Sequence, residues 1–269
     1  MRNKSIRRYA SVAAIAFRDR FSSRGDAALG TAMSAVSVFM AWILWRAIFA
    51  GRATVGGLTL SMTLTHYVIA AFVGRLDQSD GYVWEFAAEI RGGTFGKYLA
   101  RPVDPLCWFL AVCAGRSLFV LLPLTVAAFA GAAILGDALA APRSAAALAV
   151  IPVAVLGLLA LSLLNFLTAL LAFAFQEITP FHLIKGEAVS FLSGMLVPLA
   201  MMPAWSRDLL RWTPFPALAS LPAALWYGTP GVGEVGSAVA VLVVWNGALL
   251  VACRLSLRAL SARYEEVGA

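Results

Sequence analysis

The sequence predicts an all-α integral membrane protein with six transmembrane helices. Of its 269 residues, 61% are hydrophobic and only 13% are charged, whereas soluble domains are about 45–50% apolar and about 25% charged. The apolar residues gather in runs long enough to cross a bilayer, which takes about 20 residues of helix. A soluble core of this size cannot bury so much apolar surface, so lipid must be the solvent for much of the chain.

Six runs are long and apolar enough to be spans: residues 27–49, 55–73, 117–135, a stretch within 145–175, 188–205 and 235–253. The fourth is longer than a span requires, which predicts a tilt, a kink or an extension into water. In the fifth, Gly194, Pro198 and Pro203 weaken a regular helix, so we expect it to break near the two prolines. Residues 212–233 are uncharged but rich in proline, which predicts a short interfacial segment and not a seventh span.

The basic residues lie between the apolar runs, as headgroup-facing loops require, and not in one soluble patch. The net charge of +7 therefore points to membrane lipids and not to nucleic acid. Most of the 21 lysines and arginines fall in the N-terminal segment, the loop 74–105 and the tail 254–269. This bias places both termini in the cytoplasm. The preference for arginine over lysine is typical of a GC-rich bacterium, so we expect a multi-pass protein of the bacterial cell membrane.

Two polar residues at the spans have two interpretations each. Arg116 is costly at the centre of a span, so it is expected to mark the cytoplasmic edge of the third span, leaving residues 106–115 along the interface. Alternatively it is a substrate counter-ion. His66 is expected to be a packed, hydrogen-bonded residue, and the alternative is a proton relay.

Nothing in the sequence predicts a catalytic or metal site. The three cysteines lack the spacing of a disulfide framework or a metal centre and are interpreted as packing residues. A phosphate-binding loop needs four residues between its glycines and a serine or threonine after its lysine. Here three residues separate Gly92 from Gly96, and Tyr98 follows Lys97. The chain is therefore expected to bind neither ATP nor any other cofactor itself.

Two segments outside the spans have helical patterns. In residues 1–26, Tyr9, Ala13, Phe17 and Phe21 recur every four residues among arginines, which is typical of an amphipathic helix on a membrane surface. A solvated basic tail is the alternative. In the loop 74–105, four apolar residues fall on one face of a helix and two glutamates on another. That helix could dock a soluble partner or rest on lipid. The apolar residues are Val83, Phe86, Ala87 and Ile90, and the glutamates are Glu85 and Glu89.

Two runs resemble the permeases of ABC-2 type (type-two) ABC exporters. The run 89–103 is similar to that family's acidic-isoleucine-arginine-small-glycine segment, followed by leucine-x-arginine-proline. The run 191–199 with residues 202–205 is similar to its serine-glycine, proline and proline-x-tryptophan pattern near span five. The order of these motifs matches the six-span layout over nearly the whole chain.

The resemblance implies an elbow helix in residues 1–26, a six-span domain over 27–253 and a cytoplasmic tail over 254–269. It implies a coupling helix, residues 83–91, that contacts a separate ATPase. It also implies a broken, re-entrant outer region over 198–234. The coupling residues would be Val83, Glu85, Phe86, Ala87, Glu89, Ile90 and Arg91, and the outer gate would hold Gly194, Pro198, Pro203 and Trp205.

The resulting hypothesis is a permease subunit without an ATPase site of its own. Its partners would be an ABC ATPase dimer, which holds ATP and Mg²⁺, and a second permease, with a heterodimer favoured over a homodimer. The assembly would export a hydrophobic or amphipathic substrate, such as a drug-like compound or a lipid. The alternative is an integral membrane enzyme acting on lipid. Such an enzyme needs a pair of titratable residues facing a cavity, and the six predicted spans offer no such pair.

Overall fold

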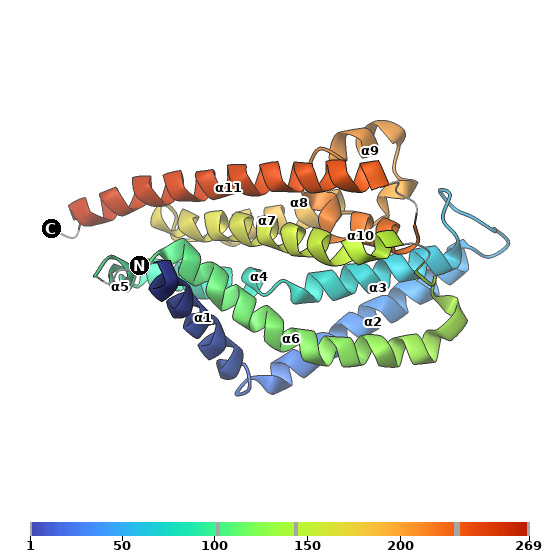
Figure 1. Ribbon diagram of the computed structural model, residues 1–269, viewed down its shortest axis with the longest axis horizontal. Helices are drawn as coiled ribbons and strands as arrows, with labels where there is room; N and C mark the ends of the chain where they lie inside the picture. The colour runs from blue at the N-terminus through green and yellow to red at the C-terminus, as the bar shows by residue number, and fades with distance from the viewer. Residues whose placement is uncertain (1, 101–102, 143–144, 229–231, 268–269) are drawn as a thin grey trace.

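The computed structural model describes residues 2–100, 103–142, 145–228 and 232–267, in which the regular secondary structure is helical, without a strand. The long helices lie roughly side by side along the long axis of the molecule (Figure 1). The start of α1 (Arg2–Asp19), α4 (Ser79–Arg91) and the end of α11 (Val232–Val267) lie toward one end. Helices α9 (Ala204–Leu210) and α10 (Ser220–Trp226) lie at the other. We call these the α4 end and the α10 end.

Among the residues that the structure describes, four helices are long and apolar enough to cross a membrane: α2 (Arg24–Ile48), α6 (Pro105–Leu135), α7 (Val150–Leu170) and α11. They confirm a multi-pass membrane protein. The second and fifth predicted spans correspond to α3 (Leu60–Leu76) and α8 (Thr179–Leu192), which have 17 and 14 residues. Both are shorter than the about 20 residues that a regular span needs, so the count of six spans stays a prediction.

The third predicted span begins too late. Helix α6 starts at Pro105, and its first turn is capped by the Asp104 side chain, which accepts a hydrogen bond from the Cys107 backbone N–H at 2.8 Å. Residues 106–115 are therefore part of one continuous helix with the predicted span. That Arg116 marks the cytoplasmic edge of this span stays a prediction.

The fifth predicted span, residues 188–205, has the wrong bounds. Helix α8 begins at Thr179 and ends at Leu192. As expected, it does not run through the prolines, but the break comes earlier, at Ser193 and Gly194. Gly194 has a φ of +82°, and a Cβ there would lie 2.0 Å from the Ser220 hydroxyl oxygen. A residue that must be glycine ends this helix before proline can.

The chain after α8 folds back into the molecule. The 3₁₀ turn η4 (Leu199–Met201) leads to α9, and η5 (Phe215–Leu218) leads to α10. Residues 212–233 were expected to lie at the interface, but Ala217, Leu218, Ala223 and Leu225 are buried. Their neighbours include α7 and α3. Pro203 and Pro214 stand at the starts of α9 and η5 and so separate the short helices. The segment can therefore turn and fill the interior.

The first and last elements that the structure describes, α1 and α11, are helices. Helix α1 falls where the amphipathic helix was expected and packs along α6. A Cβ at Gly115 would meet the Ala13 carbonyl oxygen at 2.1 Å, so glycine permits this close approach. Part of the apolar face of α1 therefore covers the chain's own helix, while Ile15 and Phe21 stay exposed. The predicted tail from residue 254 continues α11 as far as Val267.

Candidate functional site around helix α4

Helix α4 is held at both ends by local interactions. Before it, the Asp77 carboxylate accepts a hydrogen bond from the Ser79 backbone N–H at 2.9 Å. Burial raises the pKa of this carboxyl group. After Arg91, the backbone ends the helix at Gly92 and turns at Gly93, which has a φ of +72°. The helix contains the predicted segment 83–91 and extends one turn before it.

The apolar face of α4 is buried inside the chain. Val83, Phe86 and Ala87 are fully buried, and Ile90 nearly so. The Phe86 ring lies 5.5 Å from the rings of both Phe109 in α6 and Phe166 in α7. The expectation that these four residues seat in a groove of a partner, or rest on lipid, is therefore wrong. An amphipathic pattern shows that one face is covered, but it does not show what covers it.

The other face of α4 carries charges that are paired within the protein. The guanidinium of Arg116 donates two hydrogen bonds to the Glu85 carboxylate, at 2.7 and 2.6 Å. Arg116 is 8% exposed and lies over the Tyr82 ring at 4.7 Å. Its charge is therefore compensated by α4, which supports a packing role over that of a substrate counter-ion. The pair also ties α4 to α6.

Two further charged residues close the C-terminal end of α4. Glu89 forms an ion pair with Lys97 at 2.7 Å and accepts a hydrogen bond from the Tyr98 hydroxyl at 2.8 Å. Burial raises the pKa of Tyr98, and the neighbouring carboxylate adds to the effect. Arg91 donates to the Gln176 carbonyl oxygen at 2.6 Å. These contacts leave Gly81, Ala88, Gly92 and Thr94 as exposed positions along the helix and the turn after it.

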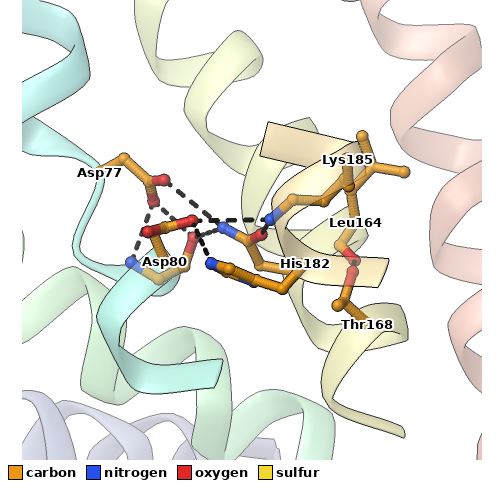
Figure 2. Close-up of polar contacts among 8 residues, drawn as sticks. Asp77, Asp80, Leu164, Thr168, His182 and Lys185 are labelled. Atoms are coloured by element: carbon orange, nitrogen blue, oxygen red, sulfur yellow. Dashed lines mark hydrogen bonds and ion pairs between the residues drawn. The ribbon is translucent and has the colours of Figure 1, made fainter. Parts of the chain in front are cut away.

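A polar network joins the start of α4 to α8 (Figure 2). One Asp80 carboxylate oxygen lies 3.1 Å from His182 Nε2 and 3.6 Å from Lys185 Nζ. Lys185 also donates to the Asn165 side-chain oxygen, and Asn165 donates to the Ser79 hydroxyl at 2.7 Å. The network therefore ties together α4, α7 and α8.

Sequence reasoning did not identify this network. Asp77, Asp80, His182 and Lys185 flank apolar runs, where charged residues are ordinary. About a hundred residues separate the two halves of the network, and no pattern in the sequence places them together. The signal that was available was a polar residue, Asn165, inside the most apolar run.

A cavity of about 790 Å³ lies beside the network at the α4 end of the molecule. Its walls come from the turn between α1 and α2, the end of α3 and one side of α8. Its lining includes both charged groups and apolar side chains. The charged residues include Arg20, Asp26, Arg75, Asp80 and Lys185, and the apolar ones include Leu29, Met33, Leu161 and Val189.

The predicted outer-gate residues are only partly brought together. The Gly194 carbonyl accepts a hydrogen bond of 2.8 Å from His66 Nε2, so His66 is packed and hydrogen-bonded. The Tyr67 hydroxyl donates to the Leu196 carbonyl at 2.6 Å. Pro198 is buried close to this point, whereas Pro203 is exposed and Trp205 is 71% exposed. Gly194 and Pro198 thus belong to a packed break, and the other two lie on the surface.

Within the described residues, no group of three or more His, Cys, Asp and Glu side chains could hold a metal ion. The arrangement instead consists of a buried helix, α4, whose charged groups join it to α6 and α8. Such an assembly can transmit movement between the α4 end and the break after α8.

A comparison with protein-family models matches residues 35–268 to the description "ABC-2 family transporter protein". Comparisons with curated proteins and with solved structures give no match. The family match covers most of the chain and agrees with its apolar helices and with the motifs at residues 89–103 and 191–205. The chain therefore belongs to the ABC-2 transporter family and is a membrane-embedded permease component of an ABC transporter.

Proposed function

We propose that the chain is the permease subunit of an ATP-driven exporter that moves a hydrophobic or amphipathic substrate out of a bacterial cell. The family match supports the permease role. The observation that carries the coupling mechanism is the position of α4, which is fixed to α6 by Arg116 and to α8 by Lys185. In this proposal six spans cross the membrane, with α3 and α8 as the second and fifth, and the α4 end faces the cytoplasm.

A separate ATPase dimer binds ATP and Mg²⁺ and docks on the exposed positions of α4 and its following turn. Closure of the dimer displaces α4. Because Asp80 binds Lys185 and His182, that displacement pulls on α8, which ends at the Gly194 break. A second permease, favoured as a different chain, supplies the other wall of the substrate pathway. In this arrangement the charged residues of α4 transmit force and do not contact the substrate.

Copurification tests the docking surface. Ala88 is exposed on α4, so Ala88→Trp should block the ATPase without disturbing the chain's own packing. Ala10→Trp makes the same change at an exposed position of α1. Tagged wild-type chain and Ala10→Trp should recover the ATPase from mild detergent, and Ala88→Trp should lose most of it. Equal recovery with both variants would show that the partner binds elsewhere.

A lipid-acting membrane enzyme is less well supported. Asp80 and His182 do face the 790 Å³ cavity, as that alternative requires. However, the Asp80 carboxylate already binds His182 and Lys185, which leaves it poorly placed as a general base. The family is also a transporter family.

A further inference from the structure

A second cavity, of about 690 Å³, lies near the α10 end, away from the α4 network. It is bounded by the break after α8, by η5 and α10, and by the first turns of α11. Its volume is within the range of about 300–1,000 Å³ that is usual for small-molecule sites. Most of its lining is apolar or aromatic, including Leu58, Leu199, Leu221, Leu242, Trp212 and Tyr227.

Three charged residues line this cavity: Arg207, Arg211 and Glu234. Arg211 is paired with Asp208 at 3.6 Å and lies over the Trp212 ring at 5.5 Å. Glu234 has an interaction of its own within the chain. Arg207 is exposed and forms no ion pair with any residue that the structure describes. The cavity thus combines an apolar interior with one guanidinium, that of Arg207, that forms no ion pair among the described residues.

We propose that this cavity binds a monoanionic amphiphile, with its hydrocarbon tail among the apolar side chains and its headgroup on Arg207. A carboxylate or sulfate accepts charge-assisted hydrogen bonds from a guanidinium, which are stronger than neutral ones. A cationic headgroup is repelled, and an uncharged one gains nothing from Arg207. Each methylene group that leaves water should tighten binding by about fourfold. The inference rests on the proposed exporter function and names the class of its substrate.

Fluorescence quenching tests the proposal with the chain alone in nanodiscs of zwitterionic lipid. The probe is 11-bromoundecanoate, because bromine quenches tryptophan on contact and Trp212 lines the cavity. Subtracting the signal of Trp212→Phe removes the contribution of the other tryptophans. We expect saturable quenching by this carboxylate and at least about tenfold weaker quenching by 11-bromoundecanol or 11-bromoundecyl-trimethylammonium.

Arg207→Gln should raise the dissociation constant of 11-bromoundecanoate at least about tenfold, as expected for loss of a hydrogen bond to a charged group. Arg52→Gln is the matched control, because Arg52 is also exposed but does not line the cavity, and its dissociation constant should not change. Both variants should keep the wild-type unfolding midpoint.

Three results would overturn the proposal: non-saturable quenching, equal affinity for the three headgroups, or no effect of Arg207→Gln. These results do not depend on the ATPase, which is absent from the experiment. Failure here with loss of the ATPase in Ala88→Trp would leave the exporter function standing without this site. Success here with equal ATPase recovery in Ala88→Trp and Ala10→Trp would refute only the docking surface.

Discussion

Phe86→Ala should strongly destabilise the chain, because Phe86 packs inside it. The side chain is fully buried, and its ring lies 5.5 to 6.2 Å from five other aromatic rings on α4, α5 (Gly96–Ala100), α6, α7 and the turn before α5. Replacing a buried phenylalanine with alanine costs about 3–5 kcal/mol, and aromatic pairs add about 0.5–1.5 kcal/mol beyond their buried area. We therefore expect Phe86→Ala to lower the free energy of unfolding by about 4–5 kcal/mol.

The chain's own cysteines provide the assay. Cys113 and Cys253 are buried free thiols, so a thiol-reactive fluorescent maleimide reports unfolding as they become accessible. For domains of 150–250 residues, 1 kcal/mol shifts the midpoint by about 2–4 °C. Phe86→Ala should thus lower the midpoint by roughly 8 to 20 °C. Phe129→Ala makes the same change at a ring that is 78% exposed, and its midpoint should stay close to that of the wild type.

The opposite result would restore the interpretation made from the sequence pattern. If Phe86→Ala unfolded at the same temperature as Phe129→Ala but lost the copurifying ATPase, the apolar face of α4 would face the partner and not the chain's own core. The internal packing of α4 would then be refuted.

Three further predictions concern the groups that fix α4 and α8, each measured with the same thiol assay. Glu85→Gln removes the partner of the buried Arg116 and should cost about 1.5–3 kcal/mol, toward the lower end because the Glu85 side chain is 53% exposed. The swap Glu85→Arg with Arg116→Glu should recover part of the loss, and no recovery would argue against a direct ion pair. Asp77→Asn should gain stability relative to wild type as the pH rises above about 4, because burial raises the Asp77 pKa and folding then disfavours the ionised carboxyl. A difference that does not change between pH 4 and pH 8 would contradict this. Gly194→Ala should cost more than about 1 kcal/mol because of its positive φ and its contact with Ser220. Gly186→Ala, with open space around it on α8, should be neutral or stabilising by up to about 1 kcal/mol, and equal effects at the two glycines would contradict the strained break.

The parts of the fold that could be predicted are those that depend on local composition. The first, fourth and sixth apolar runs correspond to α2, α7 and α11 within a few residues at most ends, because a helix in lipid must be apolar along its length. The predicted helix bounds were wrong where a contact between residues distant in the sequence determines where a helix begins or ends. The helix of the third span begins at Pro105 and not at Ser117, and Glu85, on another element, compensates the Arg116 charge within it. Gly194 ends α8 because Ser220 and the chain near Leu199 leave no room for a Cβ there.

The candidate site could be predicted only as a helix, and not as a set of contacts. The apolar spacing of Val83, Phe86 and Ile90 identified α4 correctly. The same spacing is compatible with a partner protein, a lipid surface or the chain's own core, since each covers an apolar face equally well. The network around Asp80 depends on α8 lying beside the start of α4, and that neighbourhood exists only in three dimensions (Figure 2).

The placement of these contacts has a mechanical consequence for the proposed coupling. Lys185 lies near the middle of α8, and about nine residues, or roughly 13 Å of helix, separate it from Gly194. A helix of this length moves as a rigid body, whereas the backbone at Gly194, with its φ of +82°, is already outside helical geometry. A displacement of α4 that is passed through Asp80 to Lys185 should therefore be taken up at Gly194. His66 and Ser220 hold that break against α3 and α10, so they are the contacts that the movement would have to rearrange.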